Sequence, residues 1–354
     1  MKIAILTFHW ATNYGAVLQT FALQSYLESI GHEVSVINYK PKKYDNTLWT
    51  FIRNRKFVHM SAYFQGNKQE KALSDFRHEK LHLTERVYQC FEIEHIAKDF
   101  DIIISGSDQV LNPSFLQHGE GKNHISPTYF LGFPFEGKRV GYALSFGCTE
   151  YPDKAKQVAQ PFLSRFDLVT VRESSGIDIV KSLGRSDAVV VPDPTLLLDS
   201  SVYQSLAAES LIRQTKPYTY CFFIRNVAER KNALYPLLQN RSVLWNNEDG
   251  HYRMQDWLSK INNSEFVITD SFHCVVMCLK LHKPFIVITE LDGNVGMNDR
   301  LYTLLKPLQL ANRVVHKNGV SVIEILANKN INWAYVENVL TSIQQQGQQF
   351  LKDM

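Results

Sequence analysis

The sequence is short of cysteine, of net charge and of long apolar runs, and each shortage excludes a class of protein. Its five cysteines show neither CxxC spacing nor an even disulfide framework, so we expect no zinc site, no disulfide and a reducing, cytoplasmic compartment. A formal net charge of +3 is too small to indicate nucleic-acid binding. No apolar stretch approaches the length of a membrane span, and the start MKIAILTFHW has no small-residue cleavage site, which favours a buried first strand over a signal sequence.

The chain of 354 residues is long enough for two domains, and its strand and helix patterns predict an α/β fold. A strand over 2–8, a helix closed by Gly31 and a strand over 33–39 form a Rossmann-like unit. The turn lacks GxGxxG, so a dinucleotide is not indicated. The prolines of VVVPDPTLLLD, from 189 to 199, fit a domain crossing. We therefore predict an N-terminal Rossmann-like domain, a C-terminal one and a final helix, over 1–185, 186–330 and 331–354.

The stretch VITDSFHCVVMCLKLHKPFIVI, residues 267–288, has the pattern of a buried strand, a helix and a second strand. Asp270 and Ser271 are typical capping residues, and the apolar spacing starts the helix near Phe272. The unpaired N–H groups and the dipole of a helix start favour an anion there. We therefore expect His273 to be mostly neutral until an anion binds beside it, and then to act as a general acid. The alternative is a histidine that caps or packs a core helix.

Polar side chains follow the first strand, at the sheet edge where open α/β folds bind ligands. His9, Asn13 and Tyr14 offer neutral hydrogen-bonding and stacking groups that suit a sugar. For Asn13 the alternative is turn chemistry alone.

The strand in FDIIISGSDQ, residues 100–109, runs directly into Ser107, Asp108 and Gln109. Asp108 is placed to hold sugar hydroxyls or to take a proton from one, and its alternative role is to cap a turn. The strand over 138–146 brings Ser145 to the same edge.

Cationic residues also stand near predicted strand ends. Arg172 closes the strand over 167–172, where it can fork onto a carboxylate or phosphate, or else pair with Glu173. Lys283 lies between the helix of His273 and the strand PFIVI, and Arg300 follows the polar turn that contains Asn298. Helix-end N–H groups and fixed cations together suit a ligand that carries both a carboxylate and a phosphate.

Residues 40–64 combine lysines and arginines with aromatic side chains. Such a segment can rest on an anionic membrane surface as a peripheral contact, or form a solvated helical lid, and we favour the lid.

Six phrases, in order along nearly the whole chain, resemble the polysaccharide pyruvyl transferase family. They are NYGAVLQTFAL, SGSDQVLNP, TVRE, VPDPTLLL, DSFH followed by a helix and KPF, and NDRLYTLL. The resemblance implies two Rossmann-like domains facing each other across a cleft, as in one large class of glycosyltransferases. It also implies phosphoenolpyruvate as donor, no cofactor or metal, and a cyclic pyruvate ketal across two sugar hydroxyls in bacterial capsules, exopolysaccharides or cell-wall polymers.

The resemblance also assigns roles. His273 matches the family's general acid, and Arg172 matches an arginine that holds the donor. Many members have arginine where this chain has Ser271, which leaves Lys283 or Arg300 to supply that charge. The predicted donor set is Arg172, Ser271, Lys283, Asn298 and Arg300, with His273 and Asp108 as acid and base. The predicted acceptor set, on the N-terminal side, is His9, Asn13, Tyr14, Ser107, Gln109 and Ser145.

Two other functions fit the same residues. One is a nucleotide-sugar-dependent glycosyltransferase, because the same two-domain architecture serves it and a fold does not determine a function. The other is a non-catalytic saccharide-binding or scaffold protein. For the pyruvyl transferase, the basic segment 40–64 favours a lipid-linked acceptor, carrying galactose or another hexose, at the inner face of the membrane.

Overall fold

The computed structural model describes residues 1–44, 60–117, 125–212, 216–291, 293, 295–316 and 330–354. The chain divides into an N-terminal unit, Met1–Pro194 with Gly347–Met354, and a C-terminal unit, Thr195–Gln346. The division falls after Pro194 and not after residue 185, because β6 (Val189–Val190) pairs in parallel with β5 (Leu168–Val171) and extends the first sheet.

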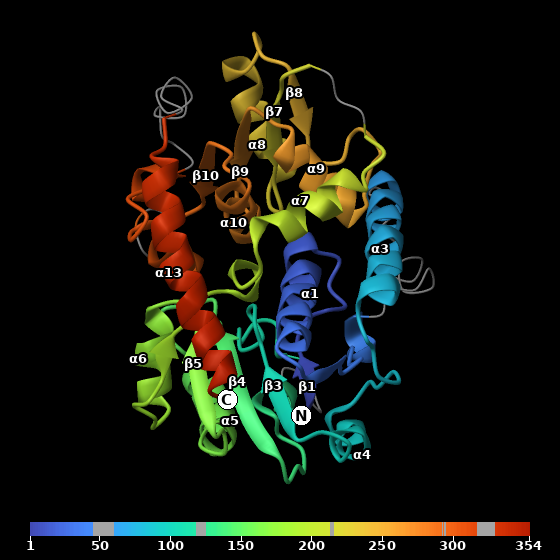
Figure 1. The fold of residues 1–354 in the computed structure, drawn as a ribbon, viewed down its shortest axis with the longest axis vertical. Helices are drawn as coiled ribbons and strands as arrows, with labels where there is room; N and C mark the ends of the chain where they lie inside the picture. The colour runs from blue at the N-terminus through green and yellow to red at the C-terminus, as the bar shows by residue number, and fades with distance from the viewer. Residues whose placement is uncertain (45–59, 118–124, 213–215, 292, 294, 317–329) are drawn as a thin grey trace. The chain divides into compact units, whose positions relative to one another are not determined.

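The N-terminal unit contains a six-stranded parallel sheet in the order β2-β1-β3-β4-β5-β6 (Figure 1). Its other strands are β1 (Lys2–Leu6), β2 (Glu33–Val36), β3 (Ile102–Ser105) and β4 (Lys138–Leu144). The central strands are continuous apolar runs because a parallel sheet is covered by helices on both faces. All four residues of β3 are buried, for example.

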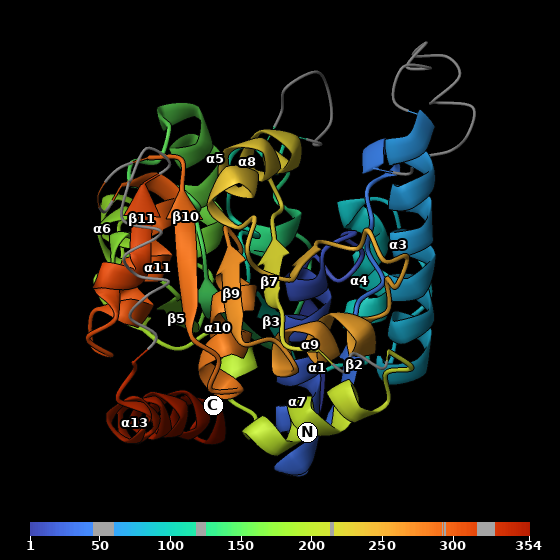
Figure 2. The same ribbon diagram turned by 90° about the horizontal axis from the view of Figure 1, so that it is seen from above.

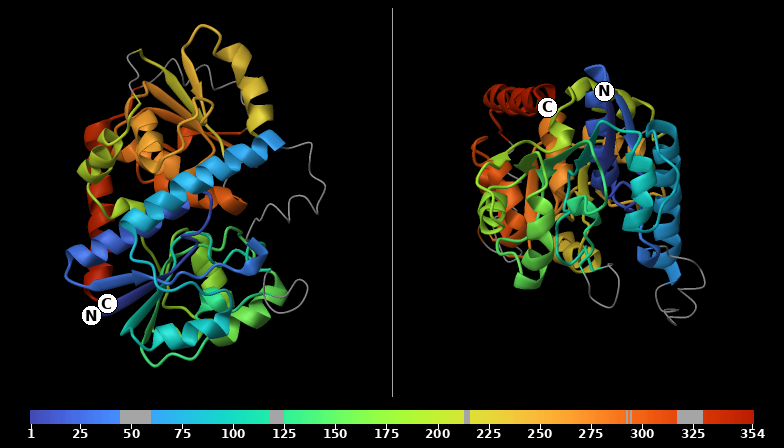
Figure 3. Two further views of the ribbon diagram at one scale, coloured as in Figure 1. Left: turned by 90° about the vertical axis from the view of Figure 1, so that its right-hand side faces the viewer. Right: turned by 90° about the horizontal axis from the view of Figure 1, so that it is seen from below.

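The helices of this unit are α1 (Tyr14–Ser29), α3 (Met60–Lys80), α4 (Ile93–Ala97), α5 (Asp153–Leu163) and α6 (Ser175–Ser182). Helix α1 begins where Asn13 accepts hydrogen bonds from the N–H groups of Gly15 and Ala16 at 2.8 and 3.3 Å. It packs against α3, alongside which it runs in Figure 3. Most residues of α1 are buried, including the polar Gln19, Thr20 and Gln24.

The C-terminal unit contains a five-stranded parallel sheet in the order β11-β10-β9-β7-β8. Figure 2 shows β11, β10, β9 and β7 side by side. The strands are β7 (Thr219–Phe222), β8 (Val243–Trp245), β9 (Phe266–Thr269), β10 (Phe285–Thr289) and β11 (Val314–His316). The helices are α7 (Ser200–Ala208), α8 (Val227–Leu234), α9 (Met254–Asn262), α10 (Phe272–Lys280) and α11 (Asp299–Leu305).

The last helix, α13 (Trp333–Lys352), is the helix predicted at the end of the chain, and its residues are divided between the two units. In the C-terminal unit its Gln344 donates to the carbonyl oxygen of Leu197 at 3.1 Å. In the N-terminal unit the carbonyl oxygen of Gln348 accepts from the hydroxyl of Tyr26, also at 3.1 Å. The chain end is tied to β4, because the amino group of Lys138 donates to the carbonyl oxygen of Met354 at 2.8 Å.

The predicted α/β class with two Rossmann-like, parallel-sheet domains is confirmed. Strand β11 is an addition, because its three residues are too few to show a period in the sequence. Most of the basic segment 40–64 lies outside the described residues.

Candidate active site

The helix that carries His273 begins as the sequence predicts. Ser271 is the residue before α10, and its hydroxyl oxygen accepts from the N–H of Cys274 at 3.3 Å. Strand β9 ends just before it, so the start of α10 lies at the carboxyl edge of the C-terminal sheet. His273 is 6% exposed in the first turn, and its ring meets that of Phe272 edge to face at 5.4 Å.

Asp270 does not cap this helix; it holds the neighbouring loop. Its carboxylate accepts from the backbone N–H groups of Ile224 at 2.7 Å and Arg225 at 3.1 Å, in the loop that joins β7 to α8. Burial raises the pKa of Asp270, although these two hydrogen bonds and the arginines nearby oppose the shift. One carboxylate therefore ties the loop after β7 to the residue that starts α10.

Arg230, on α8, is neutralised by two carboxylates. Its Nε lies 3.6 Å from Asp270 Oδ2, and its Nη2 lies 2.5 Å from Glu290 Oε1. Glu290 follows β10 and also accepts from the side chain of Asn226 at 3.2 Å. The ends of β7, β9 and β10 are thus joined by one network of charges.

The polar turn after β10 brings Asn298 and Arg300 to the same place. The Asn298 amide donates to the carbonyl oxygens of Leu291 and Gly293 at 2.8 and 2.9 Å, which holds the turn closed. The guanidinium carbon of Arg300 lies 5.5 Å from the ring centre of Phe272. Arg300, Phe272 and His273 are therefore consecutive neighbours.

These residues surround a pocket of about 60 Å³, which we call the arginine pocket. Its lining comes from the ends of β7, β9 and β10 and from the residues that follow them: Arg225, Arg230, Asp270, Ile288, Thr289, Glu290, Leu291, Met297, Asn298, Arg300 and Leu301. Sequence reasoning missed Arg225, Arg230 and Glu290. Asp108 was selected because it is a polar residue just after a predicted strand. Arg225 and Glu290 also follow strands closely, so the same rule could have selected them.

The structure does not bring Lys283 to this edge. Lys283 follows the C-terminal end of α10 and precedes β10, so it lies at the amino edge of the sheet. The seven residues of α10 that follow His273, a length of about 10 Å, lie between it and Lys283. Burial lowers the pKa of its amino group. Of the two candidates for the charge absent at Ser271, only Arg300 is near His273.

In the N-terminal unit, Arg172 is enclosed by three carboxylates. Its Nη1 lies 2.9 Å from Asp193 Oδ2, its Nη2 3.4 Å from Asp108 Oδ1 and its Nε 3.6 Å from Glu173 Oε2. Burial opposes the charge of Arg172, but the three carboxylates outweigh it and raise the pKa of Arg172 above its ordinary value. The predicted alternative, pairing with Glu173, is thus present as part of a larger cluster. We call these four residues the carboxylate cluster.

Ser145 and Ser107 serve this cluster as buried donors. The hydroxyl of Ser145 donates to Glu173 Oε1 at 2.7 Å. The hydroxyl of Ser107 lies 3.4 Å from Asp193 Oδ2 and 2.9 Å from the carbonyl oxygen of Ala143. Both serines are 0% exposed, so their hydroxyls are engaged inside the unit. The preceding Gly106 has φ +111°, and a Cβ there would collide with the carbonyl oxygen of Tyr142.

Of the remaining predicted acceptor residues, His9, Tyr14 and Gln109 are buried and Asn13 is half-buried. His9 is 1% exposed and lies 3.3 Å from the Asn38 side-chain oxygen, and its burial lowers its pKa to about 4. Tyr14 is 1% exposed. Asn13 caps α1, and Gln109 accepts from the Asn112 amide at 2.8 Å. In this structure each of them has a structural role, because β-α turns of a tightly packed sheet bury their own polar groups.

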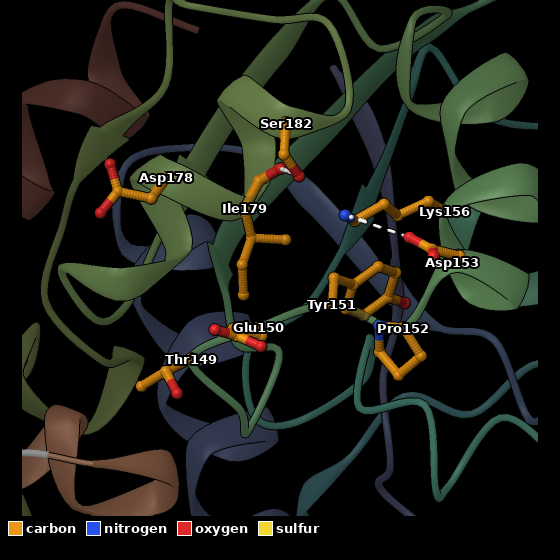
Figure 4. Close-up of a pocket in the computed structure, with 9 residues that line it drawn as sticks. All are labelled: Thr149, Glu150, Tyr151, Pro152, Asp153, Lys156, Asp178, Ile179 and Ser182. Carbon is orange, nitrogen blue, oxygen red and sulfur yellow. Dashed lines mark hydrogen bonds and ion pairs between the residues drawn. The ribbon is translucent and has the colours of Figure 1, made fainter.

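Two larger cavities lie in the N-terminal unit. One, of about 440 Å³, is lined in part by charged side chains and is drawn in Figure 4 between the start of α5 and the face of α6. Lys156 and Asp153 form an ion pair of 3.4 Å there. The other, of about 490 Å³, is lined largely by aromatic and proline side chains, among them Tyr39, Phe133 and Phe162. Neither is lined by a residue of the predicted acceptor set among the described residues.

No helix in the described part of the chain is both long enough and apolar enough to span a membrane.

The fold places the chain in a class of two-domain α/β proteins that includes sugar-nucleotide epimerases. The UDP-GlcNAc 2-epimerase of Methanocaldococcus jannaschii, in complex with UDP-GlcNAc and UDP, is similar with a TM-score of 0.51 and 11% identity, over 98% of this chain and 100% of that chain. That of Neisseria meningitidis, bound to UDP-GlcNAc, has a TM-score of 0.46 and 10% identity over 98% and 100%. Escherichia coli ADP-heptose lps heptosyltransferase II has a TM-score of 0.40 and 10% identity, over 98% of this chain and 99% of that chain. At 11% identity the likeness to the Methanocaldococcus jannaschii enzyme shows the fold alone.

The sequence comparison is more specific. The profile of the polysaccharide pyruvyl transferase family matches residues 13–292, and the chain belongs to this family of transferases. No curated protein sequence matches the chain.

Proposed function

We propose that the protein transfers the enolpyruvyl group of phosphoenolpyruvate onto two hydroxyls of a sugar, forming a cyclic pyruvate ketal. The observation that supports this best is the place of His273, in the first turn of α10 next to Arg300 and the arginine pocket, in a chain of this family. Phosphoenolpyruvate carries a carboxylate and a phosphate, and a helix start flanked by arginines is suited to bind such groups.

The proposed reaction begins with a proton. His273, protonated beside the donor, gives its proton to the methylene carbon, which becomes the methyl group, and carbon two becomes an oxocarbenium-like centre. One sugar hydroxyl attacks carbon two and loses its proton to a base, for which we propose Asp108. The bond from carbon two to the phosphate oxygen then breaks, and phosphate takes the proton from Asp108 and leaves as hydrogen phosphate. The second hydroxyl closes the ring at carbon two, and its proton restores the acid form of His273.

The roles proposed for the N-terminal unit require a rearrangement of the carboxylate cluster. Arg172 can hold the donor only if an anionic group of the donor replaces one of its three carboxylate partners. We propose that this partner is Asp108, because its side chain is 16% exposed and the other two are more deeply buried. Asp108 would then be free to accept a proton. We propose a hexose acceptor, carried on a lipid at the inner face of the membrane, in capsule, exopolysaccharide or cell-wall synthesis.

The test is a donor assay. The protein is incubated with phosphoenolpyruvate and a panel of galactose- and mannose-bearing acceptors, free and lipid-linked, and phosphate release is followed with the mass of the acceptor. We expect release of one phosphate for each acceptor that gains a pyruvate less one water. Release of a nucleoside diphosphate from a nucleotide sugar, with no reaction of phosphoenolpyruvate, would replace this proposal with the glycosyltransferase alternative.

A substitution tests the acid. His273→Gln is expected to lower kcat by about a hundred- to ten-thousandfold, because a positioned general acid contributes that much. His251→Gln, at an exposed histidine of the same unit, is the matched control and should keep full activity. Equal activity of both variants would remove His273 from the mechanism.

A further inference from the structure

The three arginines of the arginine pocket have different partners. Arg230 is neutralised by Asp270 and Glu290. Arg300 stacks over Phe272. Arg225 is exposed and, within the described residues, forms no ion pair; its Nη2 lies 3.0 Å from the sulfur of Met297. A thioether is a weak acceptor and leaves the charge of the guanidinium in place.

Arg225 is nevertheless fixed relative to the start of α10. Its backbone N–H donates to Asp270 at 3.1 Å, and Asp270 immediately precedes Ser271, the first capping residue of that helix. On the other side, the contact with Met297 holds its guanidinium against the turn that carries Asn298. A cation held at both ends loses little conformational freedom when it binds an anion.

The pocket is small and rich in arginine. Its volume of about 60 Å³ is well below that of the two cavities in the N-terminal unit. A small pocket lined by three arginines suits a compact oxyanion such as a phosphate or a carboxylate group. The planar guanidinium of an arginine donates to two oxygens of such a group at once.

We propose that Arg225 binds a phosphate group in the arginine pocket. Resting on the function proposed above, this makes Arg225 a donor-binding residue that recognises the phosphate of phosphoenolpyruvate. The same chemistry also admits free inorganic phosphate, the other product, so the two sources are separated by experiment.

The first arm measures binding of inorganic phosphate to the full chain by isothermal titration calorimetry. Arg225→Gln is expected to weaken binding by about ten- to a hundredfold, because a hydrogen bond to a charged group is lost. Arg225→Lys keeps the positive charge but lacks the planar guanidinium that donates to two oxygens, so it should recover part of the phosphate affinity. Arg241→Gln removes an exposed arginine elsewhere in the same unit and should bind phosphate as the wild type does.

The second arm measures KM and kcat for phosphoenolpyruvate in the same variants. A similar rise in KM for Arg225→Gln, with a smaller change in kcat, supports the donor as the source of the phosphate. Weakened phosphate binding with unchanged KM supports a site for free phosphate and overturns the donor assignment.

Two further results bear on the site itself. The oxyanion site is overturned if the wild type binds no phosphate, or if Arg225→Gln and Arg241→Gln bind it equally well. Because calorimetry needs no acceptor, a chain that binds phosphate through Arg225 but never transfers pyruvate would retain the site and lose the proposed function.

Discussion

The carboxylate cluster predicts that Arg172→Met destabilises the N-terminal unit. The side chains of Arg172, Asp193 and Glu173 are 1%, 0% and 5% exposed, so the substitution strands two buried carboxylates without their cation. Removing one partner of a buried ion pair costs about 3–5 kcal/mol of folding free energy. For a unit of this size, that corresponds to a fall in Tm of about 6–20 °C.

The pH dependence has a definite sign. The folded-state pKa of Arg172 is raised, so its stabilising charge is fully present below the ordinary arginine pKa and is lost only above it. In the wild type, Arg172 should therefore cause no change in folding stability with pH across the neutral range. In Arg172→Met, acid neutralises the stranded carboxylates, so the loss of stability relative to the wild type should shrink as the pH falls.

Urea unfolding followed by circular dichroism measures these effects. Lys156→Met is the control, because it breaks an ion pair whose side chains are 37% and 92% exposed and should cost under about 0.5 kcal/mol. Adding Asp193→Asn to Arg172→Met removes one stranded charge and should recover part of the loss. An Arg172→Met protein as stable as the control would refute the view that this cluster is a buried structural element.

Two further predictions follow from single positions. His9 has a pKa of about 4 in the folded protein against an ordinary value near 6.5, so the unfolded chain takes up its proton first and stability should fall by about 3 kcal/mol as the pH drops through that interval. His9→Gln should abolish this slope in urea unfolding, and a slope that persists would contradict it. Lys283→Met should leave the KM for phosphoenolpyruvate unchanged in steady-state assays, because Lys283 lies at the far edge of the sheet from His273; a marked rise would show that it reaches the donor.

The elements of the fold were largely predictable because they depend on local patterns. The continuous apolar run of β3 and the helix from Met254 to Asn262 can be recognised within a dozen residues. Less predictable were β6 and β11, with two and three residues, since a strand that short shows no period and is stabilised by its neighbour in the sheet. The boundary between the two units lies after Pro194 and not after residue 185 for the same reason, because the short strand β6 was not recognised in the sequence.

The site was predicted in part. The place of His273 at a helix start followed from capping residues and apolar spacing, which are local. The roles of Ser145 and Ser107 could not be predicted from local signals, because a polar residue after a strand can either face a ligand or be buried against the end of another strand. Which of these occurs depends on partners such as Glu173, 28 residues away from Ser145.

The sequence by itself determined where the strands end, where α10 starts and which polar residues stand at those points, because each is set by neighbours along the chain. Only the tertiary structure decided which charges neutralise one another. Asp270 reaches Arg225 across 45 residues, and Arg172 reaches Asp108 across 64. Coulomb interactions depend on distance in space. Only the folded sheets therefore show that the guanidinium of Arg225 forms no ion pair with a carboxylate of the described residues, and that Arg172 is enclosed by three carboxylates.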